Sequence, residues 1–138
     1  MNERDQRVLA ELDPKLRTIV NYILLHVNAK GKLPKGIVLR PHTGYRSAAA
    51  QLLAYARGVS KLKRGKHNEK PARACDLVFC VDGRWSWGSS LPYWLIGYWA
   101  EKASLTWGGR WGTPHEARNV IAHSGMEYGW DPCHVELP

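Results

Sequence analysis

Two histidines and one aspartate are the side chains in this sequence best suited to bind a transition metal. His67 ends a basic stretch, Asp76 interrupts the apolar run Ala74–Phe79, and His134 lies close to residue 138. A carboxylate at a buried strand position needs a partner or a metal, because its desolvation is costly. Two imidazoles and one carboxylate leave one zinc position open for water, whose pKa falls to about 7 on a catalytic zinc. We therefore expect a catalytic zinc site formed by His67, Asp76 and His134.

Two acidic residues near His134 are candidates for proton transfer. Asp131 precedes His134 in Asp131-Pro132-Cys133-His134, and Pro132 restricts Asp131 to extended geometry. Glu136 stands two residues after His134 and shares its face of a strand. We expect Asp131 to act as the general base. Glu136 is the rival base, or a partner that orients a ligand.

Structural interpretations of the same residues stay open. Asp76 could face solvent on a half-exposed strand, and a lone histidine in a basic loop is more often a surface residue. Cys133 beside His134 suggests a Cys/His nucleophile, but neighbours on a strand point to opposite faces. The other histidines are interpreted as structural or surface groups, with His42 as the first exception.

The segment Thr43–Ser47, with the sequence TGYRS, could supply a cation to the same site. The guanidinium of Arg46 could stabilise the oxyanion that forms when hydroxide attacks a peptide carbonyl. The structural alternative is a capped turn with an exposed arginine.

The elements expected to position these residues have local signals. Asp13-Pro14 begins a helix that ends near Gly31, and Ser47 can cap a helix closing at Gly58. Asp82-Gly83 between two apolar runs is a strong hairpin signal. The remaining expected elements are a short helix through Val8–Leu12, a third helix at Pro92–Ala103, and strands at Ile37–Leu39, Ala72–Val81, Arg84–Trp87 and His134–Leu137. We expect one α+β domain over residues 1–138, with a short antiparallel sheet, flanking helices and the zinc site on the sheet.

Charge and composition narrow the classes of partner. The 20 Lys and Arg residues against 12 Asp and Glu give a net charge of +8, which favours a polyanionic partner or serves only as a solvated surface. Three cysteines without a C-x-x-C pair argue against a disulfide framework and a cysteine-rich zinc site. The charged N-terminus and the short apolar stretches predict neither a signal peptide nor stable membrane insertion.

These motifs, in this order, resemble the zinc D-Ala-D-Ala carboxypeptidase/L-alanyl-D-glutamate peptidase family, in particular its phage endolysin members. The resemblance spans about Val38 to Leu137. It is carried by the following segments: Gly44-Tyr45-Arg46-Ser47 with Gln51, His67 with Ala74-Cys75-Asp76, Trp107-Gly108-Gly109-Arg110-Trp111, and Asp131 with His134 and Glu136.

The resemblance implies a zinc-dependent peptidoglycan peptidase that cuts a stem-peptide bond, L-Ala–D-Glu in the first place. It implies that Asp131 is the catalytic base and that Arg46 contacts the oxyanion or a substrate carboxylate. Glu136, Gln51, Tyr45 and Trp107 would then support the site or bind substrate. We expect a monomer that binds peptidoglycan and no nucleic acid. It would be made in the host cytoplasm and reach the periplasm or wall after release through a holin.

Two other functions stay open from the sequence alone. The same site could hydrolyse a D-Ala-D-Ala dipeptide or release a terminal D-Ala. The basic cluster Lys61–Lys70 could instead mark a non-catalytic module that binds cell wall or nucleic acid. The segment between Trp111 and Trp130, which contains His115, Glu116, His123 and Glu127, has no assigned role.

Overall fold

The computed structural model describes residues 1–58, 65–113 and 121–138. Its centre is an antiparallel sheet in the order β1-β2-β5-β4, with β3 paired to the other end of β2. The strands are β1 (Ile37–Thr43), β2 (Ala74–Val81), β3 (Arg84–Ser86), β4 (Thr106–Trp107) and β5 (His134–Glu136). The helices are α1 (Glu3–Ala10), α2 (Pro14–Val27), α3 (Ala48–Ala56), α4 (Tyr93–Lys102) and the 3₁₀ turns η1 (Lys66–Asn68) and η2 (Gly108–Arg110).

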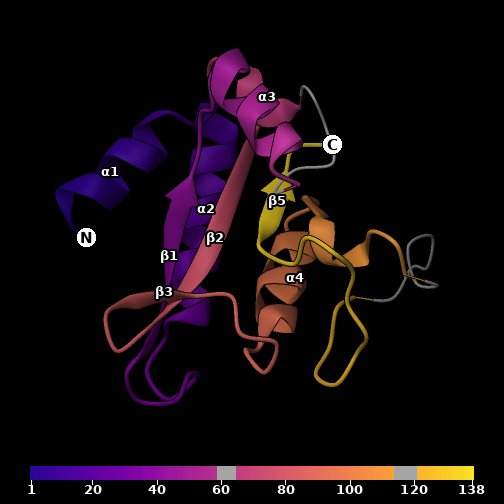
Figure 1. The fold of residues 1–138 in the computed structure, drawn as a ribbon. Coiled ribbons are helices and arrows are strands. Elements are labelled where there is room, and N and C mark those ends of the chain that lie inside the picture. The colour runs from indigo at the N-terminus through magenta and orange to yellow at the C-terminus, as the bar shows by residue number, and fades with distance from the viewer. Residues whose placement is uncertain (59–64, 114–120) are drawn as a thin grey trace.

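Helices α2 and α4 cover one face of the sheet and pack against each other (Figure 1). The core between them contains alternate residues of β2, namely Cys75, Leu77 and Phe79, all fully buried. Because side chains alternate along a strand, Asp76 and Val78 lie on the opposite face of β2. The candidate site lies on that opposite face. The expected α+β domain with a short antiparallel sheet is confirmed.

The expected helix starts are also confirmed, and their caps explain them. Asp13 accepts a hydrogen bond from the Lys15 backbone N–H at 2.9 Å, and Ser47 accepts one from Ala50 at 3.1 Å. Each cap satisfies a backbone donor that the first helical turn leaves unpaired. Helix α3 therefore begins directly after Arg46, which fixes where that side chain leaves the backbone.

Strand β1 is longer than the expected Ile37–Leu39, because Pro41 does not end it. The strand lies at the edge of the sheet, where a residue without an N–H removes no ladder hydrogen bond. Pairing with β2 shifts register between Pro41 and Thr43, so His42 is the extra residue of a β-bulge. The bulge brings Thr43 opposite Asp76.

The short helix α1 is held against β1 by ionic contacts. Asp5, which is 4% exposed, accepts two hydrogen bonds of 2.9 Å from Arg40. Arg4 donates to the carbonyls of Pro41 and His42, which lie at the bulge. Helix α1 therefore supports the strand that carries one wall of the site.

Trp107 occupies a space that glycines create. Its ring is 1% exposed, and a Cβ at Gly97 or Gly109 would lie within about 2.6 Å of ring atoms. A Cβ at Gly108 would meet the carbonyl of Asp131 at 2.3 Å. The Trp-Gly-Gly sequence thus lets the segment before His134 approach β4 closely.

Some sequence expectations concern residues that the structure does not describe. Lys61, Lys63 and Arg64 of the basic cluster, and His115 and Glu116, lie outside the described residues. Among the helices of the described part, none is long and apolar enough to cross a bilayer.

Candidate functional site

Asp76 and His134 are brought together by strand register. They are directly opposite each other in the antiparallel pair β2–β5. Opposite residues in such a pair have Cβ atoms about 4.5–5.5 Å apart, within reach of a shared ion. The Asp76 Oδ1 atom lies 3.3 Å from His134 Nδ1.

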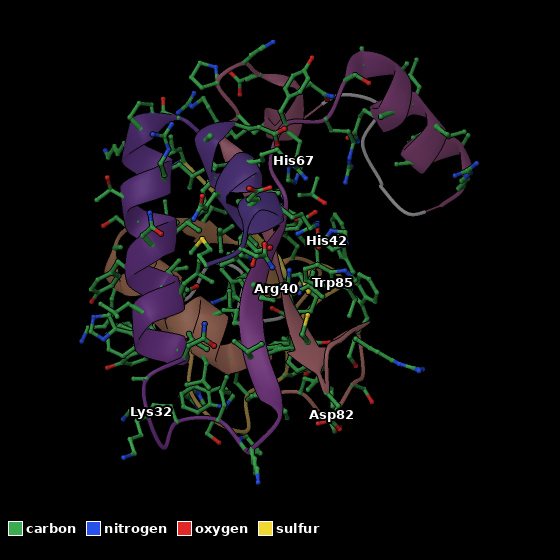
Figure 2. The ribbon with its side chains drawn as sticks, turned by 90° about the vertical axis from the view of Figure 1, so that its left-hand side faces the viewer. Lys32, Arg40, His42, His67, Asp82 and Trp85 are labelled. Carbon is green, nitrogen blue, oxygen red and sulfur yellow. The ribbon has the colours of Figure 1, made fainter. Side chains whose placement is uncertain are left out.

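His67 reaches the same point from η1, which is docked on the Gly44–Ser47 turn. The His67 carbonyl accepts a hydrogen bond from the Arg46 N–H at 2.8 Å, and the Asn68 side chain donates to the Arg46 carbonyl at 2.7 Å. His67 Nδ1 lies 2.7 Å from the Gly44 carbonyl. The turn that we expected to present Arg46 therefore also positions His67. Figure 2 shows His67 above His42 on the same side of the sheet.

The hydrogen-bond partners of each imidazole decide which nitrogen faces Asp76. A carbonyl can only accept, so His67 Nδ1 carries a proton, and in the neutral ring Nε2 has the free lone pair. His134 Nε2 lies 2.8 Å from Glu136 Oε1, which leaves Nδ1 toward Asp76. His67 thus presents Nε2 and His134 presents Nδ1.

These three side chains could hold a metal ion. Their ligand atoms all lie within 4.8 Å of one another, and each imidazole nitrogen is 3.3 Å from Asp76 Oδ1. Ligands about 2.0–2.1 Å from a tetrahedral zinc are separated by about 3.3 Å, so the two spacings to Asp76 fit. Among the described residues, His67 Nε2 is buried without a hydrogen-bond partner, since its contact with Asp76 lacks hydrogen-bond geometry. A cation between this nitrogen and the Asp76 carboxylate would satisfy both groups.

When no metal is bound, the pKa values of Asp76 and His134 depend on each other. Burial opposes ionisation of Asp76, but electrostatic interaction with His67 and the hydrogen bond of His134 hold its pKa below the usual range. Burial lowers the pKa of His134, but hydrogen bonds to Asp76 and Glu136 outweigh this and raise it to about 10. A cation would take the place of the proton on His134 Nδ1, because a metal ligand must be deprotonated.

The group lies in a cavity of about 520 Å³. Asp131, Arg46 and Glu136 reach this cavity together with the three possible ligands. Its walls also carry several aromatic side chains, namely His42, Trp87, Tyr93, Trp111, Tyr128 and Trp130. The size suits a small peptide segment rather than a single water.

Asp131 faces His134 at the edge of the cavity. Its Oδ2 lies 3.8 Å from His134 Nδ1, and its side chain is 33% exposed. Burial, with the nearby charge of Asp76, raises the pKa of Asp131 to about 6. A carboxyl with a raised pKa can both accept and return a proton near neutral pH.

Arg46 is held in place by Gln51. Its Nη1 donates to Gln51 Oε1 at 2.8 Å, and its Nη2 lies 3.8 Å from Asp76 Oδ2. Gln51 is 3% exposed, although it belongs to a helix whose other described residues are mostly exposed. The guanidinium therefore has a fixed position beside the metal-binding group.

Three other expected site residues differ in whether they reach the cavity: Glu136 does, and Trp107 and Tyr45 do not. Both oxygens of Glu136 are engaged, Oε1 by His134 and Oε2 by Lys66 at 2.9 Å, which suits an orienting role better than that of a base. Trp107 is buried in the core and does not line the cavity; its Nε1 donates to the Pro132 carbonyl at 2.8 Å, which supports the segment before His134. Tyr45 does not line the cavity either and packs against the core.

Cys133 lines the cavity but lacks the features of a nucleophile. Its side chain is buried, and burial raises the pKa of its thiol. A reactive cysteine requires a lowered pKa. The two other cysteines, Cys75 and Cys80, are also free and buried.

Sequence reasoning missed Lys66 and the bulge at His42. Lys66 was interpreted only as part of a basic loop, and its contact with Glu136 depends on a pairing over 70 residues of chain. The one sequence feature that could have indicated this contact is that Lys66 directly precedes His67. The bulge has no sequence signal apart from Pro41, and it places both His42 and Thr43 in the cavity wall.

Comparisons with known proteins found a similar fold but no similar sequence. No protein-family model matches the chain, and no curated protein matches its sequence. The fold does have a counterpart among solved structures. It is similar to the crystal structure of the L-Ala D-Glu endopeptidase ChiX from Serratia marcescens, with a TM-score of 0.67. The alignment covers 100% of this chain and 89% of that chain, at 22% identity.

Proposed function

We propose that this protein is a zinc-dependent peptidoglycan peptidase that hydrolyses the L-Ala–D-Glu bond of the stem peptide. One observation carries the proposal: two imidazoles and a carboxylate converge in a cavity, and the unpaired Nε2 of His67 is buried against Asp76. The fold shared with an L-Ala D-Glu endopeptidase supports the substrate class. The motif resemblance supports the lytic role of a phage endolysin.

In this proposal, the metal-binding residues, Asp131 and Arg46 each have a separate role in the reaction. His67, Asp76 and His134 would hold the zinc, which when bound supplies a Lewis acid and lowers the pKa of water. Asp131 would accept a proton from the attacking water and deliver it to the leaving amine. Arg46, held by Gln51, would stabilise negative charge on the carbonyl oxygen of the cut bond.

The decisive experiment measures metal content and bond cleavage together. The purified wild type is expected to contain about one zinc per chain, and His134→Ala is expected to lose it. The wild type should reduce the turbidity of purified cell walls, and a chelator should abolish this activity. Mass spectrometry should then identify new amino termini on D-Glu.

Other outcomes distinguish the alternatives. New termini on D-Ala, or released D-Ala, would assign the site to a carboxypeptidase or dipeptidase. A protein that binds walls or nucleic acid in a strongly salt-dependent way, contains no zinc and cuts nothing would be a binding module. Either result would contradict the proposed function.

A further inference from the structure

Lys66 connects the two segments that carry the imidazoles. Its ammonium lies 2.9 Å from Glu136 Oε2 and also donates to the carbonyl of Leu137. The other oxygen of Glu136, Oε1, lies 2.8 Å from His134 Nε2. Because Lys66 directly precedes His67, a continuous chain of ammonium, carboxylate and imidazole joins η1 to β5.

We propose that Lys66 is a positioning residue that fixes His134 as a ligand through Nδ1, by holding the carboxylate of Glu136. This inference rests on the proposed metal site. A ligating histidine is oriented by the acceptor of its other nitrogen, which here is Glu136. Lys66 engages the oxygen that His134 does not use, so the carboxylate cannot rotate away from the imidazole.

Burial makes this contact more than an ordinary surface ion pair. The Glu136 side chain is 17% exposed and that of Lys66 is 30% exposed. Without the ammonium, the largely buried carboxylate of Glu136 would lose its Lys66 partner and would be drawn toward solvent. Its hydrogen bond to His134 would weaken as a result.

The backbone of η1 does not depend on the Lys66 side chain. The Lys66 carbonyl accepts a hydrogen bond from the Arg73 N–H at 3.0 Å. The turn is closed separately, by the Gly65 N–H on Asn68 Oδ1 at 2.7 Å. Shortening or neutralising Lys66 should therefore change the orientation of His134 rather than unfold the segment that carries His67.

The test compares metal binding by Lys66→Met, Lys66→Arg and the control Lys70→Met in the full chain. Lys70 is exposed in the same loop, so its substitution removes the same charge without touching Glu136. Zinc affinity is measured by competition with a chromophoric chelator, and the visible spectrum of bound Co²⁺ reports ligand geometry. We expect Lys66→Met to bind zinc about tenfold more weakly and to change the Co²⁺ spectrum. Lys66→Arg and Lys70→Met should resemble the wild type.

Two results would overturn the inference, and they are distinguishable. If the wild type binds neither zinc nor Co²⁺, the metal site is absent and the proposed function falls too. If the wild type binds both ions and Lys66→Met has the same affinity and spectrum, only the role of Lys66 is refuted. Circular dichroism of the metal-free proteins checks folding, and Lys66→Gln replaces the methionine variant if that variant does not fold.

Discussion

The two imidazoles of the site present different ring nitrogens, and in each case a neighbour makes the choice. The Gly44 carbonyl sets the tautomer of His67, and Glu136 sets the orientation of His134. Neither neighbour is itself a possible ligand in the metal-binding group. Metal affinity should therefore respond to residues one contact away from the ion, as well as to the ligands.

Asp131→Asn separates metal binding from catalysis. The amide keeps the shape of the side chain but cannot accept a proton, and Asp131 is not among the three residues that could hold the ion. We expect zinc content to remain at the wild-type level and kcat to fall by about 10²–10⁴-fold. Zinc analysis and steady-state kinetics on a stem-peptide substrate measure the two properties. Loss of zinc from this variant would instead make Asp131 a ligand.

At the scale of single residues, the sequence predicted which side chains meet but only some of the residues that hold them, such as Glu136 and not Lys66. His67, Asp76 and His134 were recognisable from residue type and motif order, and the structure brings their ligand atoms together. Trp107 was expected to support the site or bind substrate; its side chain is buried in the core, from where it donates to the Pro132 carbonyl. Burial of an aromatic residue depends on tertiary packing, which its own sequence neighbourhood does not encode.

At the scale of elements, helix α4 contains Gly97, although glycine is an unfavourable residue inside a helix. Alanine at an exposed helical position is about 1 kcal/mol more favourable than glycine. At Gly97, however, an added Cβ would lie 2.4 Å from a ring carbon of Trp107. We expect Gly97→Ala to lower the free energy of unfolding by about 1–3 kcal/mol, measured by urea denaturation. An increase in stability would mean that the Trp107 ring can move away without cost.

The contact between α1 and β1 should make stability depend on pH. Burial raises the pKa of Asp5, but its hydrogen bonds and ion pairs with Arg40 and Arg4 outweigh this and lower it. A carboxyl with a lowered folded pKa stabilises the protein above its unfolded pKa of about 4, and this contribution disappears as pH falls through the folded value. Asp5→Asn should therefore cost about 2 kcal/mol at neutral pH.

The pH series provides the control for this prediction. Urea denaturation of the wild type and Asp5→Asn should give unfolding free energies that converge as pH falls through the lowered pKa of folded Asp5. A difference that stays constant with pH would show that the substitution acts through packing rather than through the charge of Asp5.

Elements with strong local signals were predictable, and those set by tertiary contacts were not. The caps at Asp13 and Ser47 and the Asp82-Gly83 turn located their elements within a few residues. Both turn residues have positive φ, 50° and 82°, as a tight hairpin requires. The two-residue strand β4 and the three-residue turn η1 are too short to show a periodicity, and contacts far away in sequence, with β5 and with Arg46, decide where they lie.

At the scale of the whole molecule, the net charge of +8 should affect capture of the substrate rather than chemistry. We expect adsorption to anionic cell walls to weaken between about 0.01 and 0.1 M salt, as the Debye length falls from about 30 to about 10 Å. Co-sedimentation with purified walls measures this. Cleavage of a small uncharged peptide substrate over the same range should stay constant; if it falls in parallel, salt acts on the site itself.

The direct pairing of Asp76 with His134 has a consequence for how the last strand finds its alignment. Strand β5 has three residues, so few backbone contacts distinguish one alignment from the next. A slip by one residue would turn His134 toward the helices and present an apolar neighbour to Asp76. A bound ion would stabilise only the correct alignment, so metal uptake would also favour the correct strand register during folding.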